Sequence, residues 1–326
     1  MVGRAAAGGA LCLARRAGAC RRQGKAADRR QDRHGLDARN GGSLSAIADI
    51  GHAKINLALH VRARGGDGYH AIETIFAFAR DGDGLAVAPD DDLSLAIDGP
   101  YAAFLAAEPA ETNLVMRAAR ALRGAFGVSA GAAIRLDKRL PVASGIGGGS
   151  ADAAAALRAL ARLWALPADD ARIMAIAAEL GADVPACVAS RTAWADGRGD
   201  RLVAMAGAEA LAGMPLLLVN PGVACPTGPV FRGWDGVDRG PLERGDPLRA
   251  ALAGRNDLEA PARALVPEIG EAIGLIAGMP GVVLARMSGS GATCFALFAE
   301  AVDRDAAAGR LMAARPGWWC LATALI

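Results

Sequence analysis

The residues with the clearest chemical potential lie in one glycine-rich stretch, residues 140–157, which reads LPVASGIGGGSADAAAAL. Its glycines, at positions 145, 147, 148 and 149, let the backbone approach a ligand closely and adopt positive φ. An alanine-rich helix is expected to begin near Ser150, so its free N–H groups and its dipole would face the loop, which favours an anion. The stretch therefore predicts a phosphate site; the alternative is a glycine-rich connector that binds nothing.

Two other kinds of glycine loop fit this stretch less well. A Walker loop requires a lysine directly after its last glycine, and none follows here. A dinucleotide-binding GxGxxG loop is nearly matched by residues 145–150, but it needs a buried parallel strand before it and an acid about 20 residues later at a strand end. Here Lys138 and Pro141 precede the loop, and the later acids Asp169 and Asp170 stand at an expected helix start. These features disfavour a Rossmann-type site.

A second group of polar residues lies on an expected strand, residues 54–61, whose apolar side chains alternate with other residues. This period places Lys54 and Asn56 together on the face opposite the core. A cation beside an amide suits the binding of a hydroxyl or a phosphate; the alternative is an ordinary solvated face. The segment Asp67-Gly68-Tyr69-His70 follows shortly after this strand.

Two shorter motifs complete the candidates. Asp183 lies between an expected helix end and Pro185, in apolar company, and is either a functional acid or a turn residue. The late segment 288–293, SGSGAT, is either a tight hairpin or a second glycine loop that packs over bound phosphates.

In this order the motifs AKINL, DGYH, GxGGGSADAA, GADVP and SGSGAT resemble the GHMP small-molecule kinases. The resemblance covers about residues 46–326. It is stronger for the members that phosphorylate the 2-hydroxyl of a cytidyl-linked methylerythritol in the non-mevalonate route to isoprenoid precursors, because these share AKINL with DGYH, GADVP and the Pro221…Thr227…Phe231 segment. Another small-alcohol acceptor, such as homoserine or mevalonate, would share the glycine loop but would not need Tyr69, His70 and Phe231. A nucleotide-binding module without catalysis would not need both Lys54 and Asp183.

The resemblance implies a role for each matching residue. Asp183 would be the general base on the attacking hydroxyl, with Lys54 keeping its carboxylate ionised, and Asn56 would orient the acceptor. The cytosine would lie between Tyr69 and Phe231, with His70 and Thr227 nearby. Mg²⁺ would accompany the ATP, and no residue is assigned as its ligand. The residues expected to hold ATP are Pro141, Gly145, Gly147, Gly148, Gly149, Ser150 and Ala151 around the phosphates, and Asn113 and Lys138 at the adenine.

The composition agrees with an enzyme of this kind. The 326 residues are 53% hydrophobic and 21% charged with a formal net charge of +2, which excludes global disorder and favours neither nucleic acid nor a membrane surface as partner. The longest uncharged stretch, residues 210–231, contains four prolines, so no membrane span is expected. The six cysteines form no CxxC pair, which favours a reducing compartment, the cytoplasm. The expected partners are therefore small-molecule substrates.

Three regions are expected along the chain. Residues 1–45, with ten Lys and Arg against three Asp, predict a disordered basic leader; an organelle transit peptide is the alternative. Residues 46–200 would form the ATP-binding and catalytic domain and residues 201–326 a second, ferredoxin-like domain, as the resemblance implies.

The elements that must position these motifs mix strands and helices without strict βαβ alternation, which indicates an α+β fold. Turns are expected at 65–68, 81–82 and 83–84. The expected strands are 54–61, 72–78, 133–136, 215–220, 282–287 and 293–298, and the expected helices are 113–126, about 150–166, 169–180, 257–264, 268–277 and 303–314.

Overall fold

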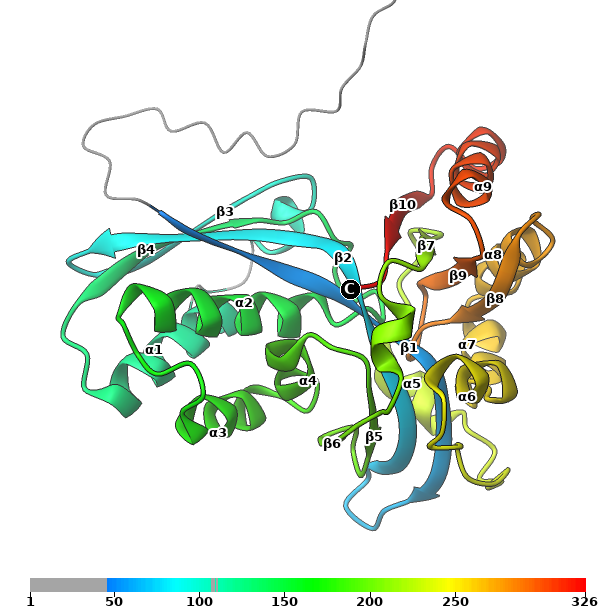
Figure 1. The fold of residues 1–326 in the computed structure, drawn as a ribbon, viewed down its shortest axis with the longest axis horizontal. Coiled ribbons are helices and arrows are strands. Elements are labelled where there is room, and N and C mark those ends of the chain that lie inside the picture. Colours follow the sequence, from blue (N-terminus) through cyan, green and yellow to red (C-terminus); the bar gives the residue numbers. More distant parts are fainter. Residues whose placement is uncertain (1–45, 107–108, 110) are drawn as a thin grey trace, which may run out of the picture. The chain divides into compact units, whose positions relative to one another are not determined.

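The computed structural model describes residues 46–106, 109 and 111–326, and the predicted leader, residues 1–45, lies outside the described residues (Figure 1). The described chain forms two sheets with helices packed against them, which confirms the α+β fold. The first sheet has the order β3-β4-β2-β5-β6, with β1 paired to β2. Its strands are β1 (Ile47–Arg64), β2 (His70–Asp90), β3 (Leu93–Asp98), β4 (Gly131–Asp137), β5 (Ala193–Asp196) and β6 (Arg201–Ala204).

The second sheet has the order β10-β7-β9-β8, and its neighbouring strands are all antiparallel. If the four strands are counted 1 to 4 in the order in which they occur along the chain, their order across the sheet is 4-1-3-2. This is the ferredoxin-like arrangement expected from the resemblance. The strands are β7 (Pro215–Asn220), β8 (Val282–Met287), β9 (Cys294–Phe298) and β10 (Trp319–Ala324). Because β6 still pairs with β5 and the second sheet begins only at β7, the division of domains near residue 200 stays a prediction.

The antiparallel pair β1–β2 links the two parts, and its strands are far longer than expected (Figure 1). The predicted turns at 81–82 and 83–84 are wrong, because β2 runs through both. Gly82 is needed there for a close approach: a Cβ on it would lie 2.0 Å from the carbonyl oxygen of Gly51 on β1. The sequence DGDG therefore marks a tight strand crossing, a feature that its composition does not distinguish from two turns.

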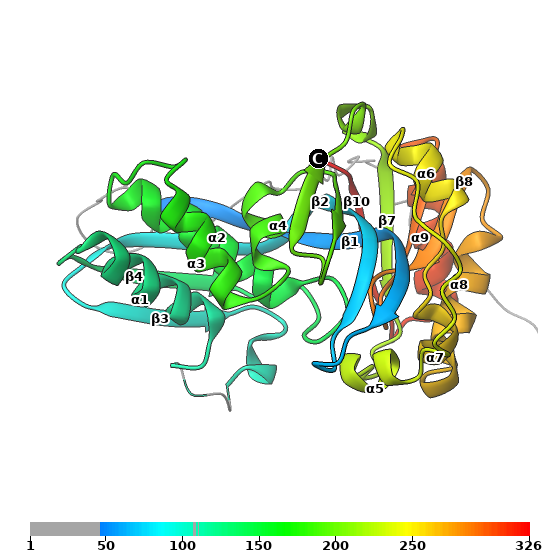
Figure 2. The ribbon, with the colours of Figure 1, turned by 90° about the horizontal axis from the view of Figure 1, so that it is seen from below.

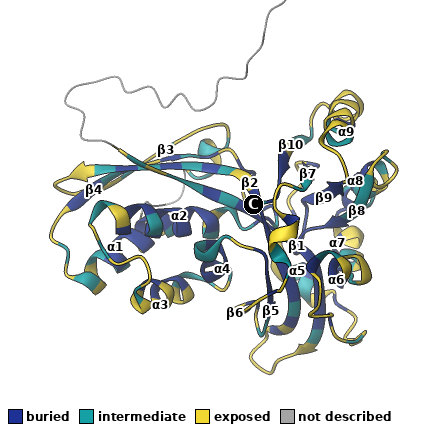
Figure 3. Cartoon of the chain, in the orientation of Figure 1, coloured by how far each residue is buried: buried dark blue, intermediate teal, exposed yellow. Residues whose placement is uncertain are grey.

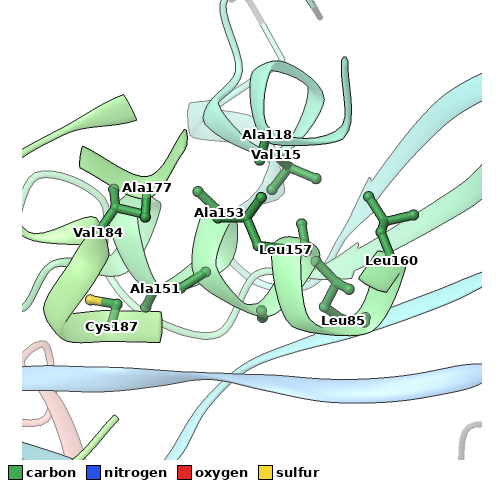
Figure 4. Close-up of a cluster of buried hydrophobic side chains, with 14 of the residues drawn as sticks. Leu85, Val115, Ala118, Ala151, Ala153, Leu157, Leu160, Ala177, Val184 and Cys187 are labelled. Carbon is green, nitrogen blue, oxygen red and sulfur yellow. The ribbon is translucent and has the colours of Figure 1, made fainter. Parts of the chain in front are cut away.

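Helices α1 (Leu114–Phe126), α2 (Gly148–Leu163), α3 (Ala171–Leu180) and α4 (Val184–Ala189) cover one face of the first sheet (Figures 1 and 2). The alanines of α2 let it pack closely against α1 on one side and against β1 and β2 on the other. Figure 3 shows α2 as almost wholly buried, whereas the outward sides of α3 and α9 are exposed. Figure 4 shows part of this core, with Leu85, Val115, Ala118, Ala151, Ala153, Leu157, Leu160, Ala177, Val184 and Cys187.

A second core joins the hairpin to the second sheet. Ile55 and Leu57 of β1 are fully buried together with Leu216, Leu218 and Phe295 of β7 and β9. A third core lies between that sheet and helices on its other face. The remaining helices are α5 (Thr227–Arg232), α6 (Pro247–Ala253), α7 (Glu259–Leu265), α8 (Glu268–Ala277) and α9 (Ala301–Ala314), with short 3-10 turns at Ala102–Phe104 and Ala208–Leu211.

No helix within the described ranges is long and apolar enough to cross a bilayer.

Candidate active site

Lys54 of β1 and Asp183 meet although they are far apart in the sequence. The Lys54 Nζ donates a hydrogen bond to Asp183 Oδ2 at 3.0 Å. Asp183 occupies the N-cap position of α4, but its side chain makes no capping hydrogen bond. The Lys54 side chain is only 5% exposed and that of Asp183 is 35% exposed. The carboxylate is thus free of its helix, held by a buried cation and open to a ligand on its other side.

The surroundings of Lys54 fix the direction of its ammonium group. Nζ also donates to Asn56 Oδ1 at 3.3 Å and lies 4.6 Å from the centre of the Phe76 ring. The Asn56 Nδ2 donates to Thr74 Oγ1 at 2.8 Å, and that hydroxyl donates to the carbonyl of Ala58 at 2.6 Å. This chain of hydrogen bonds sets which way the Asn56 amide faces. Asn56 therefore holds Lys54 in place, and its expected contact with an acceptor stays a prediction.

The alternative of an ordinary solvated face for Lys54 and Asn56 is excluded, because both residues are buried. Every residue from 53 to 61 is buried, on both faces of the strand. Lys54 is 4% exposed and Asn56 is 2% exposed. The face with Lys54 is covered by the glycine-rich loop, because the Lys54 backbone N–H donates to the carbonyl of Ile146 at 3.0 Å. Gly147 lies directly over the lysine, where a Cβ would come 3.2 Å from Lys54 Cε.

The glycine-rich loop leads into α2 as its composition predicts. Gly147 is the N-cap residue, with φ 64°, and the helix begins at Gly148 rather than at Ser150. The N–H groups of Gly148, Gly149 and Ser150 therefore belong to the first turn, which has no acceptor within the helix. Ala151 does not fit its expected role, because its N–H already donates to the Gly147 carbonyl at 2.8 Å and its side chain is 1% exposed.

The late loop SGSGAT packs against the first glycine loop and does more than turn a hairpin. The Ser288 hydroxyl donates to the Gly145 carbonyl at 3.1 Å and accepts the Asn56 backbone N–H at 3.2 Å. A Cβ on Gly145 would lie 2.6 Å from the Gly291 carbonyl oxygen. Ser288 thus ties the glycine-rich loop to β1. Sequence reasoning treated it only as part of a motif, and no signal in its spacing identifies this contact.

Two adjoining cavities lie beside the start of α2. One, of about 140 Å³, is bordered by Pro141, Gly148 and Gly149; the other, of about 300 Å³, is bordered by residues with apolar side chains, such as Leu95 and Ile97, and by Asn113. Asn113 borders both, and its Oδ1 also accepts the Val115 N–H as the cap of α1. A cavity bordered by apolar side chains suits a nucleoside base.

Lys138 borders the smaller cavity, but its ammonium group is directed toward two carboxylates. Nζ donates to Asp83 Oδ2 at 2.5 Å and to Asp152 Oδ2 at 2.6 Å. Asp83 Oδ1 accepts the backbone N–H groups of Arg139 and Leu140 at 2.6 and 2.8 Å. Burial, more than the nearby Asp83, raises the pKa of Asp152 to about 8, although Lys138 opposes the shift. This buried triad supports the floor of the cavity, so a direct contact of Lys138 with adenine stays a prediction.

The residues expected around a cytosine form a separate group at the tip of the β1–β2 hairpin. The His70 ring lies 5.2 Å from that of Phe231 and 5.7 Å from that of Trp234, measured between centroids. Tyr69 is 58% exposed and stacks with the guanidinium of Arg198, 3.9 Å from the ring centre. The structure thus places His70, rather than Tyr69, against Phe231.

Thr227 and two residues that sequence reasoning missed complete this group. Thr227 Oγ1 lies 2.9 Å from Ser290 Oγ, which connects α5 to the SGSGAT loop. Trp234 packs edge-on against His70, and Arg64 donates to His70 Nε2 at 3.2 Å. The signal for Arg64 was available, because a hairpin with a tight loop over 65–69 places residue 64 opposite residue 70.

Comparison with known proteins agrees with this geometry. Residues 113–191 match the GHMP kinases N terminal domain and residues 241–315 match the GHMP kinases C terminal family. The chain is 63% identical over 277 residues to a 4-diphosphocytidyl-2-C-methyl-D-erythritol kinase of Rhizorhabdus wittichii, covering 85% of this chain and 94% of that one.

Two solved structures share the fold. A 4-(cytidine 5'-diphospho)-2C-methyl-D-erythritol kinase is 36% identical with a TM-score of 0.69, covering 85% of this chain and 98% of that one. A homoserine kinase from Cytophaga hutchinsonii has a TM-score of 0.60 and covers 88% of this chain and 97% of its own, but at 17% identity it shows the fold alone. The chain therefore belongs to the 4-diphosphocytidyl-2-C-methyl-D-erythritol kinase family within the GHMP kinases.

Proposed function

We propose that this enzyme transfers the γ-phosphoryl group of ATP to the 2-hydroxyl of 4-diphosphocytidyl-2-C-methyl-D-erythritol, a step of non-mevalonate isoprenoid precursor synthesis. The observation that carries the proposal is the Lys54–Asp183 pair, 3.0 Å apart, next to a phosphate loop at a helix start. Phosphoryl transfer needs positioning and charge stabilisation more than covalent help, and this site offers both. The 63% identity to a kinase of that name supports the choice of acceptor.

In this mechanism Asp183 accepts the proton of the attacking 2-hydroxyl. Its carboxylate is available because it caps no helix, and the ammonium of Lys54 holds it in position at 3.0 Å. Lys54 also stabilises the negative charge that develops on the reacting oxygens. Asn56 acts by holding Lys54 at this position.

The triphosphate of ATP lies against the first turn of α2, where the N–H groups of Gly148, Gly149 and Ser150 and the helix dipole favour anions. Gly145 and Gly147 shape this loop, while Pro141 and Asn113 border the base cavity. Two side chains with oxygen donors lie on the loop side of α2: Ser150 in its first turn, and Asp152, which borders the same cavity as Gly148 and Gly149. Donors of this kind fit Mg²⁺, which protein sites commonly hold through one or two carboxylates together with substrate phosphates. The ion would supply charge neutralisation for the phosphates.

The cytidyl part of the acceptor lies at the hairpin tip, with Tyr69 and Phe231 as its expected stacking partners and His70 and Thr227 nearby. The aromatic rings of this group suit a base that stacks. We keep the cytoplasm as the expected location, since the four described cysteines are free thiols, as in a reducing compartment.

The test is an assay of ATP consumption with the cytidyl compound, homoserine and mevalonate as alternative acceptors. We expect turnover with the cytidyl compound alone, and mass spectrometry of the product should place the new phosphate on the 2-oxygen. Preferential turnover of homoserine or mevalonate would overturn the choice of acceptor, and ATP binding without any turnover would overturn the assignment of catalysis.

A further inference from the structure

At the end of the β1–β2 hairpin, the ring of His70 is in contact with Arg64, Phe231 and Trp234. Arg64 and His70 are directly opposite partners in the strand pair, and the Gly65 N–H donates to the Tyr69 carbonyl at 2.7 Å to close the loop. Phe231 and Trp234 pack against the His70 ring, which is 8% exposed. The ring therefore has little freedom to turn.

Arg64 contacts one particular nitrogen of this ring. Its Nε donates to His70 Nε2 at 3.2 Å, and its Nη2 donates to the carbonyl of Arg232 at the end of α5 at 3.4 Å. A guanidinium group donates hydrogen bonds and never accepts them, so Nε2 must offer its lone pair. Burial and the charge of Arg64 both lower the pKa of His70, which keeps the ring neutral. A neutral imidazole carries one proton, and here that proton belongs on Nδ1.

Nδ1 makes no hydrogen bond with any residue in the described ranges of the chain. It is therefore a single N–H donor at a site that the proposed function assigns to a pyrimidine. Cytosine and uracil differ at N3: cytosine has a lone pair there and uracil has an N–H. If the Nδ1–H of His70 faces N3, cytosine accepts its hydrogen bond. With uracil the two N–H groups would face each other, and neither would have an acceptor.

We propose that Arg64 is a positioning residue that fixes the proton of His70 on Nδ1, and that this donor selects cytosine over uracil in the acceptor. The inference rests on the proposed function for the identity of the ligand, but the Arg64–His70 hydrogen bond can be tested in the free enzyme.

The first measurement is of the free enzyme with ¹⁵N-labelled histidine, whose chemical shifts distinguish a protonated from a bare ring nitrogen. The His70 signals are assigned by their loss in His70→Gln. We expect a protonated Nδ1 and a bare Nε2 in the wild type, and a shift toward protonated Nε2 in Arg64→Met. A protonated Nε2 in the wild type would overturn the proposal whatever the enzyme's substrate is.

The second measurement is calorimetric binding of cytidine and uridine diphosphates with the donor site filled by a non-hydrolysable ATP analogue. The wild type should prefer the cytidine compound, and Arg64→Met should reduce that preference by about 10-fold or more, since an unsatisfied buried polar group typically costs that much. Arg64→Lys keeps a donor and should restore most of the preference. Arg62→Met is the matched control, because Arg62 lies on the same strand but pairs with Asp238 and Glu73.

The steady-state kinetics should show the same selectivity as a change in KM for the cytidyl acceptor, with the KM for ATP unchanged. If Arg64→Met weakens both nucleotides equally, Arg64 has a merely structural role and the proposal fails. If the wild type binds cytidine diphosphate selectively but phosphorylates no cytidyl acceptor, the proposed function fails while the inference about Arg64 stands.

Discussion

Asp183 lies at a helix N-cap position but does not cap the helix, which leaves its carboxylate available for chemistry. Asp170 and Asp246, which also precede helices, accept backbone N–H groups as caps, whereas Asp183 makes no such bond and contacts Lys54 instead. A cap is typically worth about 1 kcal/mol, which α4 forgoes at this position. The carboxylate is thereby available to accept a proton from the substrate.

Replacing the carboxylate of Asp183 with an amide should therefore stop catalysis and leave ATP binding intact. We expect Asp183→Asn to lower kcat by about 10²–10⁴-fold, the usual effect of losing a general base. ATP affinity, measured by calorimetry, should change little because the phosphate loop is separate. Asp170→Asn is the control and should leave kcat unchanged. Near-normal turnover of Asp183→Asn would remove this residue from the mechanism.

Asp152 should make stability depend on pH. Burial raises its pKa to about 8 in the folded protein, so between pH 4 and 8 the folded state holds a proton that the unfolded chain has lost. Stability then falls as the pH rises through this window, by at most about 1.4 kcal/mol per pH unit. Urea unfolding of Asp152→Asn across the window should show a flatter profile than the wild type. A profile with the same slope in both proteins would contradict a protonated Asp152.

For single residues, the sequence predicts those that belong to motifs. It does not predict the residues that hold these in place through long-range contacts. Lys54, Asp183 and the glycines were identifiable because their types and neighbours are unusual. Asp83 was hidden in a segment that reads as two turns, although its carboxylate binds Lys138 and two backbone N–H groups. Contacts of this kind depend on how distant strands cross, and local spacing does not encode them.

Among the elements, the phosphate loop depends on residues without side chains. Gly147 has φ 64°, and a Cβ there would press on Lys54 at 3.2 Å. The carbonyl of the preceding residue, Ile146, anchors the loop to β1. The loop and the catalytic lysine therefore form one unit, held from the other side by Ser288.

A methyl group at Gly147 should disturb both the loop and the lysine. The left-handed conformation alone costs an alanine about 1–2 kcal/mol, so Gly147→Ala should lower the free energy of unfolding by about that amount. We also expect a higher KM for ATP and a lower kcat, since the ammonium of Lys54 is displaced. Gly124→Ala is the control: it lies in α1 with no atom near its Cβ, and it should be neutral or stabilising. Unchanged kinetics in Gly147→Ala would show that the loop tolerates the methyl group.

The elements themselves were predictable where the periodic pattern was long. The helix 268–277 and the strands 215–220 and 282–287 have the predicted bounds, and α1 begins one residue after its cap, Asn113. The strands β3, β5, β6 and β10 and the helices α4, α5 and α6 were missed. All of these contain four to seven residues, too few for a period to be distinguished, and they are held by their neighbours rather than by local propensity.

For the whole molecule, the proposed acceptor site combines residues from distant parts of the chain. His70 comes from the hairpin of the first sheet, and Phe231 comes from α5, which follows the first strand of the second sheet. The Thr227–Ser290 contact adds the SGSGAT loop. The strand order of the second sheet and this assembly could be expected only from the resemblance to a family, because strand pairing is a long-range property.

Removing the Phe231 ring should weaken the acceptor and spare the donor. We expect Phe231→Ala to weaken binding of the cytidyl compound by about 1–3 kcal/mol, the range for a base stacked on an aromatic ring. Tyr69→Ala should act in the same direction if the base also reaches that ring. Calorimetry with each substrate decides the matter. A loss of ATP affinity with normal binding of the cytidyl compound would place these residues at the donor instead.

The long β1–β2 hairpin also determines the order in which the chain can fold. The part of the hairpin around Ile55 and Leu57 is covered by Leu216, Leu218 and Phe295, which are synthesised much later. In a nascent chain that ends at β6, one apolar face of this hairpin is therefore exposed to solvent. A β-hairpin without a partner for that face is only marginally stable in water. Because its partners are remote in sequence, the core closes late and folding is slow. We expect a fragment ending at residue 204 to aggregate at concentrations where the full chain stays monodisperse in light scattering.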